Sequence, residues 1–302
     1  MKYQKTIKNE VTFEGVGLHT GKICKVTLRP AKSNTGIIFF RVDRGNMIKL
    51  SPFAVVDTSF ATTIGYNGTR IKTIEHLMAV LSAFEIDNVF IDVDGPEIPA
   101  LDGSSSEIAK IVLKAGLSIQ SASRKIIEIT QPISFEEGKS RIAALPHNGR
   151  KFSQTIEFSN HFLGKQRISI DLTPEVFVSD IAPARTFGFL KDVEMLRQHG
   201  LGRGGSLDNA VIIDDNGVIN PSGTRFPDEF VRHKALDCIG DMYLCGFQIH
   251  GHIIAERTGH TANVKFLKKL LESRDCFRTY QFETDSSAPQ YITAPLFEHN
   301  IN

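Results

Sequence analysis

A helix is predicted for residues 229–241, and its polar side chains constrain what the rest of the chain must supply. His233, Asp237 and Asp241 stand at positions i, i+4 and i+8, so they form one polar line along the helix. Lys234 falls on the same arc, whereas the apolar side chains of this stretch point the other way. A histidine and an aspartate one turn apart can both reach one metal ion. A solvent-facing polar stripe is the alternative interpretation, and only residues elsewhere in the chain can decide between the two.

The composition is ordinary for a soluble globular protein. Hydrophobic residues make up 41% and charged residues 23% of the chain. Its length of 302 residues is enough for about two domains with a sizeable core. The formal net charge of +1 gives no electrostatic reason to expect nucleic acid as a partner. The N-terminus lacks the apolar stretch of a signal peptide, no segment is long enough to span a membrane, and the four cysteines form no CxxC pair. We therefore expect a cytoplasmic, reduced protein without a nucleic-acid partner or a transmembrane segment.

Strands and helices are expected in a similar order in two halves of the chain. The first half is predicted to contain strands within 6–41 and 89–93 and helices over 74–84 and 105–115. After a candidate boundary at 121–124, the second half is predicted to contain strands 126–129, 140–144, 152–158, 166–172, 211–213 and 248–255, and helices 192–198, 228–244 and 262–271. Residues 45–70 are expected to be irregular with short extended pieces, and the tail from Arg274 carries no strong pattern. We therefore predict an α+β fold with two similar domains, residues 1–122 and 123–302.

Two further polar spots lie at expected helix starts: Glu75 and His76 in the helix over 74–84, and His260 at the junction of a loop with the helix over 262–271. Thr73 is a plausible N-cap, which places Glu75 and His76 in the first turn of the helix over 74–84. The exposed N–H groups and the helix dipole favour an ionised Glu75 there, although simple dipole compensation is an alternative role for this carboxylate. A catalytic zinc takes three ligands from His and Asp/Glu and keeps one open position, which His76, His233 and Asp237 would satisfy.

The glycine-rich stretch 200–205 matches a dinucleotide-binding fingerprint letter by letter, but its surroundings argue against a nucleotide cofactor. It is expected to follow a helix and to precede a strand, the reverse of strand–turn–helix. A helix stop followed by a flexible turn is the interpretation we favour. A serine or cysteine hydrolase is not favoured either, because the chain has no Gly-x-Ser-x-Gly elbow and no motif that marks a nucleophilic cysteine.

Several motifs follow one another in order along the chain. After Gly15-Val16-Gly17-Leu18-His19 come Thr73-Ile74-Glu75-His76-Leu77-Met78, Ile98-Pro99-Ala100-Leu101-Asp102-Gly103-Ser104, Ala184-Arg185-Thr186-Phe187-Gly188-Phe189, Val231-Arg232-His233-Lys234-Ala235-Leu236-Asp237-Cys238-Ile239-Gly240-Asp241 and Gly259-His260. This set spans nearly the whole chain and resembles the bacterial UDP-3-O-acyl-N-acetylglucosamine deacetylases of lipid A biosynthesis. Any one motif alone would be weak, whereas their co-occurrence is highly specific.

The resemblance implies a metal-dependent amidase and a fold for it. Such an enzyme removes the N-acetyl group from UDP-3-O-(3-hydroxyacyl)-N-acetylglucosamine, releasing acetate and the free amine in the committed step of lipid A biosynthesis. The two α+β domains would pack as a β-α-α-β sandwich, with the active site at the domain interface and a βαβ insert near 186–218. The cofactor would be Zn²⁺, and Fe²⁺ fits the same ligands. We expect a monomer that binds this UDP-sugar substrate.

The resemblance also assigns roles to individual residues. Zinc would be held by His76, His233 and Asp237, and Glu75 would act as general base when the zinc-bound water attacks the amide. The remaining catalytic residues would be Thr186, which polarises the acetamide carbonyl, His260 as electrostatic or acid partner, Asp241, which holds His260, and Lys234, which reaches toward the sugar or diphosphate. The sequence leaves open whether Glu75 alone or His260 protonates the leaving amine.

Substrate contacts are expected mainly from the insert. Its aromatic and apolar residues would line a channel for the acyl chain, although ordinary core packing is an equally good account of any one of them. Phe158 or Phe162 would stack on the uracil. The expected substrate-binding residues are His19, Phe158, Phe187, Phe189, Asp192, Val193, Gly205, Ser206 and Lys234. The competing hypothesis is a catalytically silent protein that binds a sugar nucleotide or a lipid on the same scaffold; it would be favoured if a ligand or Glu75 were missing, and none is.

Overall fold

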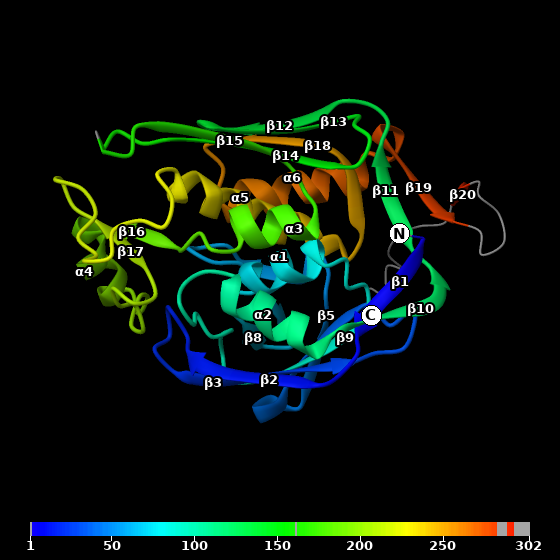
Figure 1. Ribbon diagram of the computed structural model, residues 1–302, viewed down its shortest axis with the longest axis horizontal. Helices are drawn as coiled ribbons and strands as arrows, with labels where there is room; N and C mark the ends of the chain where they lie inside the picture. Colours follow the sequence, from blue (N-terminus) through cyan, green and yellow to red (C-terminus); the bar gives the residue numbers. More distant parts are fainter. Residues whose placement is uncertain (1, 161, 283–288, 293–302) are drawn as a thin grey trace.

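The protein is built as two outer sheets with helices between them (Figure 1). The structure, a computed structural model, describes residues 2–160, 162–282 and 289–292. The layers run sheet, helices, helices, sheet, so the expected α+β class and β-α-α-β sandwich are confirmed. None of the helices in the described ranges has the length and hydropathy that a membrane span requires.

The first outer layer is a five-stranded sheet in the order β2-β3-β9-β4-β5. Its neighbours are antiparallel except for β4 and β9, which run parallel. Alternate residues of β3 are buried, so one face of the sheet packs on α1 and α2 while the other faces solvent. The elements of this half are β1 (Tyr3–Ile7), β2 (Val11–Val16), β3 (Ile23–Pro30), β4 (Ile37–Arg41), η1 (Val42–Arg44), β5 (Asn46–Lys49), η2 (Pro52–Ala54), β6 (Val55–Asp57), β7 (Thr63–Tyr66), β8 (Thr69–Ile71), α1 (Glu75–Ala83), β9 (Val89–Asp94), α2 (Ser106–Ala115) and β10 (Leu117–Ser123).

The second outer layer is an eight-stranded sheet. Strand β18 lies inside it, parallel to β11 and β14 and antiparallel to β13. The elements are β11 (Lys125–Ile129), β12 (Ile133–Glu137), β13 (Ser140–Leu145), β14 (Arg150–Glu157), β15 (Lys165–Asp171), α3 (Pro174–Val176), η3 (Phe177–Ile181), β16 (Phe187–Phe189), α4 (Leu190–Gln198), β17 (Val211–Ile213), α5 (Glu229–Met242), η4 (Tyr243–Cys245), β18 (Gln248–Glu256), α6 (His260–Glu272), η5 (Arg274–Cys276), β19 (Phe277–Phe282) and β20 (Pro289–Ile292). Strands β16 and β17 pair in parallel around α4, as a βαβ unit does.

Some elements differ from the sequence expectation. Residues 45–70 contain the short strands β5 to β8 with irregular stretches between them, as expected, whereas β12 and β19 were not expected. Strand β12 forms a hairpin with β13, and β19 pairs with β11 over five residue pairs, so tertiary pairing stabilises strands that lack a clear apolar alternation. Thr73 is not the N-cap of α1. That position is Ile74, and Thr73 has a left-handed backbone with φ 60°. The tail expectation beyond residue 282 falls largely outside the described residues.

Helices α1 and α5 cross at the centre of the sandwich with their backbones in direct contact. All nine residues of α1 are buried, and α5 is buried along most of its length. A Cβ atom at Gly240 would lie 2.1 Å from the carbonyl oxygen of Glu75 and 3.2 Å from the backbone nitrogen of Ala79. Only glycine permits this approach. The crossing therefore sets the polar line of α5 directly against the first turn of α1.

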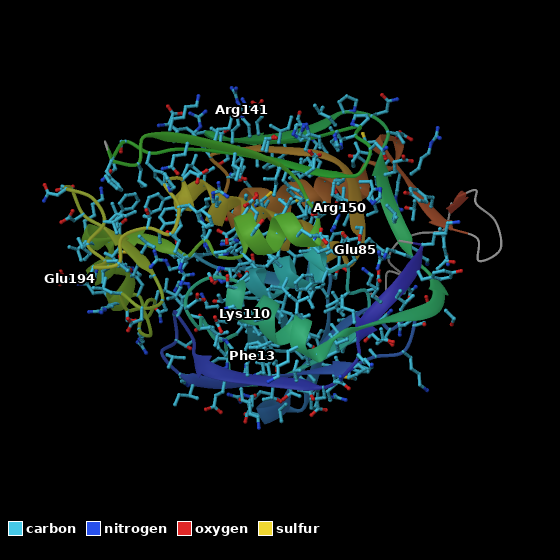
Figure 2. The ribbon with its side chains drawn as sticks, in the orientation of Figure 1. Phe13, Glu85, Lys110, Arg141, Arg150 and Glu194 are labelled. Atoms are coloured by element: carbon cyan, nitrogen blue, oxygen red, sulfur yellow. The ribbon has the colours of Figure 1, made fainter. Side chains whose placement is uncertain are left out.

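A buried group of charges joins the two halves beside β1 and β10. Arg124, which is 1% exposed, donates to both carboxylate oxygens of Asp87 and to Glu85. Lys5 Nζ lies 2.9 Å and Arg150 Nη2 3.7 Å from the Glu85 carboxylate. Figure 2 shows Arg150 and Glu85 close together. Burial alone would raise the pKa of Glu85, but the hydrogen bond from Lys5 and the charge of Arg124 lower it to about 2.

We propose that the domain boundary lies at residues 122 and 123, next to this group of charges. Strand β10 pairs with β1, whereas β11 belongs to the second outer sheet, and Arg124 alone separates β10 from β11. Each outer sheet is composed of residues from one side of this point. Arg124 would then fasten the two domains where the chain passes between them.

Replacing Gly240 by alanine is expected to force α1 and α5 apart. The added Cβ would overlap the backbone of Glu75, which cannot rotate away as a side chain can. We expect Gly240→Ala to lower the free energy of unfolding by about 3 kcal/mol, at the upper end of overpacking effects. Chemical denaturation measures this. Gly188→Ala is the control, because a Cβ at Gly188 would meet nothing within 4 Å. Equal stability of the two variants would contradict the close crossing.

The charge group predicts a loss of stability in acid. Because the pKa of Glu85 in the folded protein lies below its usual value of 4.5, the stabilisation is fully present above pH 4.5 and is lost as the pH falls toward about 2. Glu85→Gln should lower the free energy of unfolding by about 2 kcal/mol at pH 7, and this difference should shrink below pH 4.5. Urea denaturation at several pH values tests it. Glu107→Gln, at an exposed pair with Lys110, should change little.

Candidate active site

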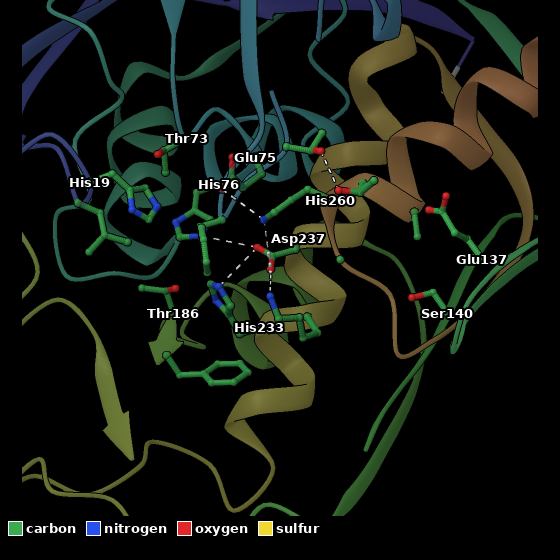
Figure 3. A pocket seen from close by; sticks show the side chains of 18 residues that line it. His19, Thr73, Glu75, His76, Glu137, Ser140, Thr186, His233, Asp237 and His260 are labelled. Carbon is green, nitrogen blue, oxygen red and sulfur yellow. Dashed lines mark hydrogen bonds and ion pairs between the residues drawn. The ribbon is translucent and has the colours of Figure 1, made fainter. Parts of the chain in front are cut away.

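A cavity of about 400 Å³ opens where the start of α1, the face of α5 and the start of α6 meet (Figure 3). Segments far apart in the chain converge on it because the α1–α5 crossing brings the two halves together. Its lining comprises Leu18, His19, Thr58, Phe60, Thr73, Glu75, His76, Glu137, Ser140, Thr186, Phe187, His233, Lys234, Asp237, Gly259, His260, Thr261 and Ala262.

Three buried side chains at this cavity are arranged as metal ligands. His76, His233 and Asp237 each offer an atom, and these atoms lie within 4.8 Å of one another. Asp237 Oδ1 is 3.8 Å from His76 Nε2 and 3.4 Å from His233 Nε2. The other ring nitrogen of His233, Nδ1, lies 3.1 Å from the carbonyl oxygen of Ala184, which leaves Nε2 free as a ligand. Two imidazoles and one carboxylate with room for a fourth ligand fit a catalytic zinc.

The protonation states of these residues also suit a metal. Burial and the nearby His233 lower the pKa of His76 to about 3, and burial lowers the pKa of His233. The pKa of Asp237 is lowered even though burial opposes this, because Lys234 Nζ lies 2.7 Å from Asp237 Oδ2. Both imidazoles are therefore neutral and the carboxylate is ionised at neutral pH, which is the state that binds a divalent metal.

Glu75 and His260 face each other across the same cavity. The distance from Glu75 Oε1 to His260 Nε2 is 3.7 Å, and both side chains are buried. Burial raises the pKa of Glu75 to about 7, with His260 opposing and the carboxylates of Asp237 and Asp241 adding to the rise. The first-turn position still favours the ionised form, as expected, because a hydrogen bond from the Glu75 backbone lowers the pKa, but burial has the larger effect. A divalent cation on the adjacent ligands would favour the ionised form.

Asp241 lies behind the cavity and holds the ring of His260. Its carboxylate is fully buried and accepts hydrogen bonds from Thr62 Oγ1 at 2.6 Å and from Asn263 Nδ2 at 2.9 Å. His260 Nδ1 lies 2.9 Å from Asp241 Oδ2. Although burial acts against it, the charges of Asp241 and Glu75 raise the pKa of His260 to about 9. His260 is therefore protonated at neutral pH, with its Nε2–H directed toward Glu75 and the cavity.

The expected substrate-binding residues divide into two groups. His19, Phe187 and Lys234 line the cavity, as Thr186 does, and Lys234 Nζ lies 5.6 Å from the centroid of the Phe187 ring. The others do not line it. The ring of Phe158 packs against Phe187 and Phe189, with ring centroids 6.0 and 5.6 Å apart, in an apolar cluster that shares Phe187 with the cavity lining. The residues outside the cavity lining are Phe158, Phe189, Asp192, Val193, Gly205 and Ser206.

Two polar residues important to the site were missed by the sequence reasoning. Glu97 is fully buried and accepts hydrogen bonds from the backbone nitrogens of His19 and Thr20 and from Thr73 Oγ1. It therefore ties the turn that carries His19 to the start of α1. Thr62 contacts Glu75, Asp241 and His260 at once. The only sequence signal for Glu97 was its place in a loop between Pro96 and Pro99. Thr62 gave no signal, because it lies in the segment expected to be irregular.

Comparisons with known proteins agree with this arrangement. The family model described as UDP-3-O-acyl N-acetylglycosamine deacetylase matches residues 4–272. A UDP-3-O-acyl-N-acetylglucosamine deacetylase of Thermodesulfovibrio yellowstonii is 48% identical over 273 residues, covering 90% of this chain and 93% of the relative. Proteins of the same name from Citrifermentans bemidjiense and Lawsonia intracellularis are 44% and 45% identical over 298 and 297 residues, covering 98% and 97% of this chain and 96% and 97% of the relatives. The chain belongs to the UDP-3-O-acyl N-acetylglycosamine deacetylase family.

Proposed function

We propose that this chain removes the N-acetyl group from UDP-3-O-(3-hydroxyacyl)-N-acetylglucosamine, releasing acetate and the free amine, as the committed step of lipid A biosynthesis. Family membership supports the substrate. One structural observation carries the chemistry: a buried His76/His233/Asp237 cluster shares a cavity with a carboxyl group and an imidazolium 3.7 Å apart. Amide hydrolysis needs an activated water, a proton acceptor and a positive group near the carbonyl oxygen, and this cavity can provide all three.

His76, His233 and Asp237 would hold the metal, which we take to be zinc, with ferrous iron as a fit for the same donor set. When bound, zinc supplies a Lewis acid that lowers the pKa of a water molecule and polarises a carbonyl group. The Ala184 carbonyl keeps the His233 ring in the orientation that this requires, and Lys234 keeps Asp237 ionised.

Glu75 is the proton acceptor in this proposal. Its Oε2 atom is occupied by the hydrogen bond from Thr62 N at 2.9 Å, so Oε1 is the atom that takes the proton of the attacking water. The same atom can return that proton to the leaving amine nitrogen, since Oε1 faces the cavity beside His260. Burial favours the protonated form of Glu75 and a metal ion on the adjacent ligands would favour the ionised form, so this group would be suited to accept and release a proton in one turnover.

His260 and Thr186 would stabilise the reacting carbonyl oxygen. The His260 Nε2–H carries a positive charge into the cavity, because Asp241 occupies Nδ1 on the far side of the ring. The Thr186 hydroxyl would donate to the same oxygen from the opposite wall. Asp241 does not reach the substrate in this scheme and acts by fixing His260.

The remaining contacts would bind the rest of the substrate. Lys234 is the cavity residue suited to the sugar or diphosphate, and His19 and Phe187 form adjacent walls. The acyl chain and the uracil would extend toward the insert, where Phe158, Phe189, Asp192, Val193, Gly205 and Ser206 are the proposed contacts. The direct test is mass spectrometry of acetate release from UDP-3-O-acyl-N-acetylglucosamine substrates of varied acyl length. Absence of acetate release from all of them would refute the proposed function.

We further propose that the protein is a monomer in the cytoplasm. All four cysteines are free, and Cys24, Cys238 and Cys245 are buried, a pattern that fits a reducing compartment. Light scattering coupled to size-exclusion chromatography would measure the oligomeric state.

Metal binding is expected to depend on His76 and not on histidines elsewhere. The purified protein should carry about one zinc per chain, measured by mass spectrometry of the metal. His76→Ala should reduce the zinc content at least tenfold and abolish deacetylation, because only two of the three ligands would remain. His199→Ala is the control, since this side chain is exposed and its ring hydrogen-bonds to the backbone oxygen of Met195, away from the cavity lining. Undiminished zinc in His76→Ala would remove this residue from the ligand set.

Glu75 is expected to affect turnover and not metal retention. Glu75→Gln keeps the shape of the side chain and its acceptor for Thr62 N but cannot take a proton. We expect kcat to fall by about 10²–10⁴ while zinc content stays near one per chain. Steady-state kinetics with metal analysis measures both. A kcat close to that of the wild type would exclude Glu75 as the base, and loss of zinc would make it a ligand.

A further inference from the structure

Thr62 connects the two proton-carrying groups of the cavity, although it is not itself part of the cavity lining. It lies directly before β7 and is fully buried. Its position matters because Glu75 belongs to α1, whereas Asp241 and His260 belong to α5 and α6. Thr62 hydrogen-bonds to Glu75 through its backbone and to Asp241 through its side chain, so it joins α1 to the α5–α6 pair.

Each polar group of Thr62 is used in this connection. The backbone nitrogen donates to Glu75 Oε2 at 2.9 Å, and the backbone oxygen accepts from Ile74 N at 3.2 Å. The hydroxyl donates to Asp241 Oδ1 at 2.6 Å, a short distance typical of a hydrogen bond to an ionised oxygen. His260 Nδ1 lies 3.2 Å from the same hydroxyl oxygen. The backbone thus fixes Glu75, and the side chain fixes the Asp241–His260 pair.

The hydroxyl controls how Asp241 can turn. Asp241 Oδ2 already binds His260 Nδ1 and Asn263 Nδ2, so the hydroxyl of Thr62 is the donor that anchors Oδ1. Without this hydroxyl, Asp241 Oδ1 would be buried without a hydrogen-bond donor, and the carboxylate could rotate about the Cβ–Cγ bond. His260 Nδ1 faces two oxygens, Asp241 Oδ2 and Thr62 Oγ1, and the ring would lose the second of these. Its Nε2–H would then no longer be held in one direction relative to Glu75.

We propose that Thr62 is a positioning residue that fixes the orientation of the His260 imidazole relative to Glu75. Its hydroxyl hydrogen-bonds to Asp241, and its backbone nitrogen hydrogen-bonds to Glu75. The inference rests on the proposed function, which assigns the proton acceptor to Glu75 and the electrostatic partner to His260. It adds a residue that touches neither substrate nor metal and that acts through two others.

The neighbouring residue provides a matched control. Thr63 is 2% exposed, and its Oγ1 is buried without a hydrogen-bond partner among the described residues. Thr62→Val and Thr63→Val thus make the same chemical change at adjacent buried positions. Removing the Thr63 hydroxyl should be neutral or slightly stabilising, because it leaves no group unpaired. Thr62→Ser keeps the hydroxyl and should preserve the function of Thr62.

The experiment compares zinc-loaded wild type with Thr62→Val, Thr62→Ser and Thr63→Val. We expect Thr62→Val to lower kcat about 10–100-fold with KM changed less than about twofold. Zinc content should be unchanged, and Thr62→Ser and Thr63→Val should stay within about threefold of wild type. If valine is not accommodated, as thermal unfolding would show, Thr62→Ala removes the same hydroxyl with less bulk, and the same kcat loss is expected.

Two background variants separate the inference from the proposed function. In a His260→Gln background, Thr62→Val should cause little further loss of kcat, because its effect passes through that ring. Additive losses of kcat in the double variant would overturn the positioning role alone. The same conclusion would follow if Thr62→Val were as active as wild type while Glu75→Gln was inactive. An inactive wild type, or a fully active Glu75→Gln, would instead refute the proposed function. A parallel rise in KM and loss of zinc in Thr62→Val would also overturn the inference, because the hydroxyl would then support the fold.

Discussion

The contact between the backbones of α1 and α5 determines where the whole site can form. At Gly240 the two helices approach so closely that a single Cβ would overlap the carbonyl oxygen of Glu75. This contact brings Glu75 and His76 against His233 and Asp237, which belong to the other half of the chain. The outer sheets stabilise the helix layers, but the site itself depends on a glycine that carries no chemical group of its own.

The buried acidic groups differ in how many donors they have, and their chemistry follows from this. Asp241 has three side-chain donors, Asp237 has Lys234, and Glu97 has two backbone nitrogens and a hydroxyl. Glu75 accepts one hydrogen bond, from Thr62 N, within the described residues. Burial raises the pKa of Glu75 to about 7, whereas the charge of Lys234 lowers the pKa of Asp237 against the effect of burial, so of these two groups Glu75 is the one that can exchange a proton near neutral pH.

Much of this arrangement could be predicted from the sequence because it depends on helical spacing. The i, i+4, i+8 line of α5 predicted that His233 and Asp237 share one face, and apolar periodicity predicted α1, α5 and α6. What the sequence could not provide were contacts made by tertiary structure. Thr73 looks like an N-cap, yet its hydroxyl binds Glu97, and Thr62 gains its partners only when three helices meet. The sequence indicated that a first-turn position favours an ionised Glu75, but it could not show the burial that raises the pKa of this group.

The complete burial of α1 has a consequence for folding during synthesis on the ribosome. Every residue of α1 is covered, and much of that cover comes from α5, which is synthesised about 150 residues later. A nascent chain that has released only its first sheet must therefore leave the α5-facing side of α1 uncovered for many seconds, at a synthesis rate of about 5–20 residues per second. Such a chain is a natural client for a chaperone. A stalled or truncated product would be prone to aggregate, even though its first outer sheet could already be paired.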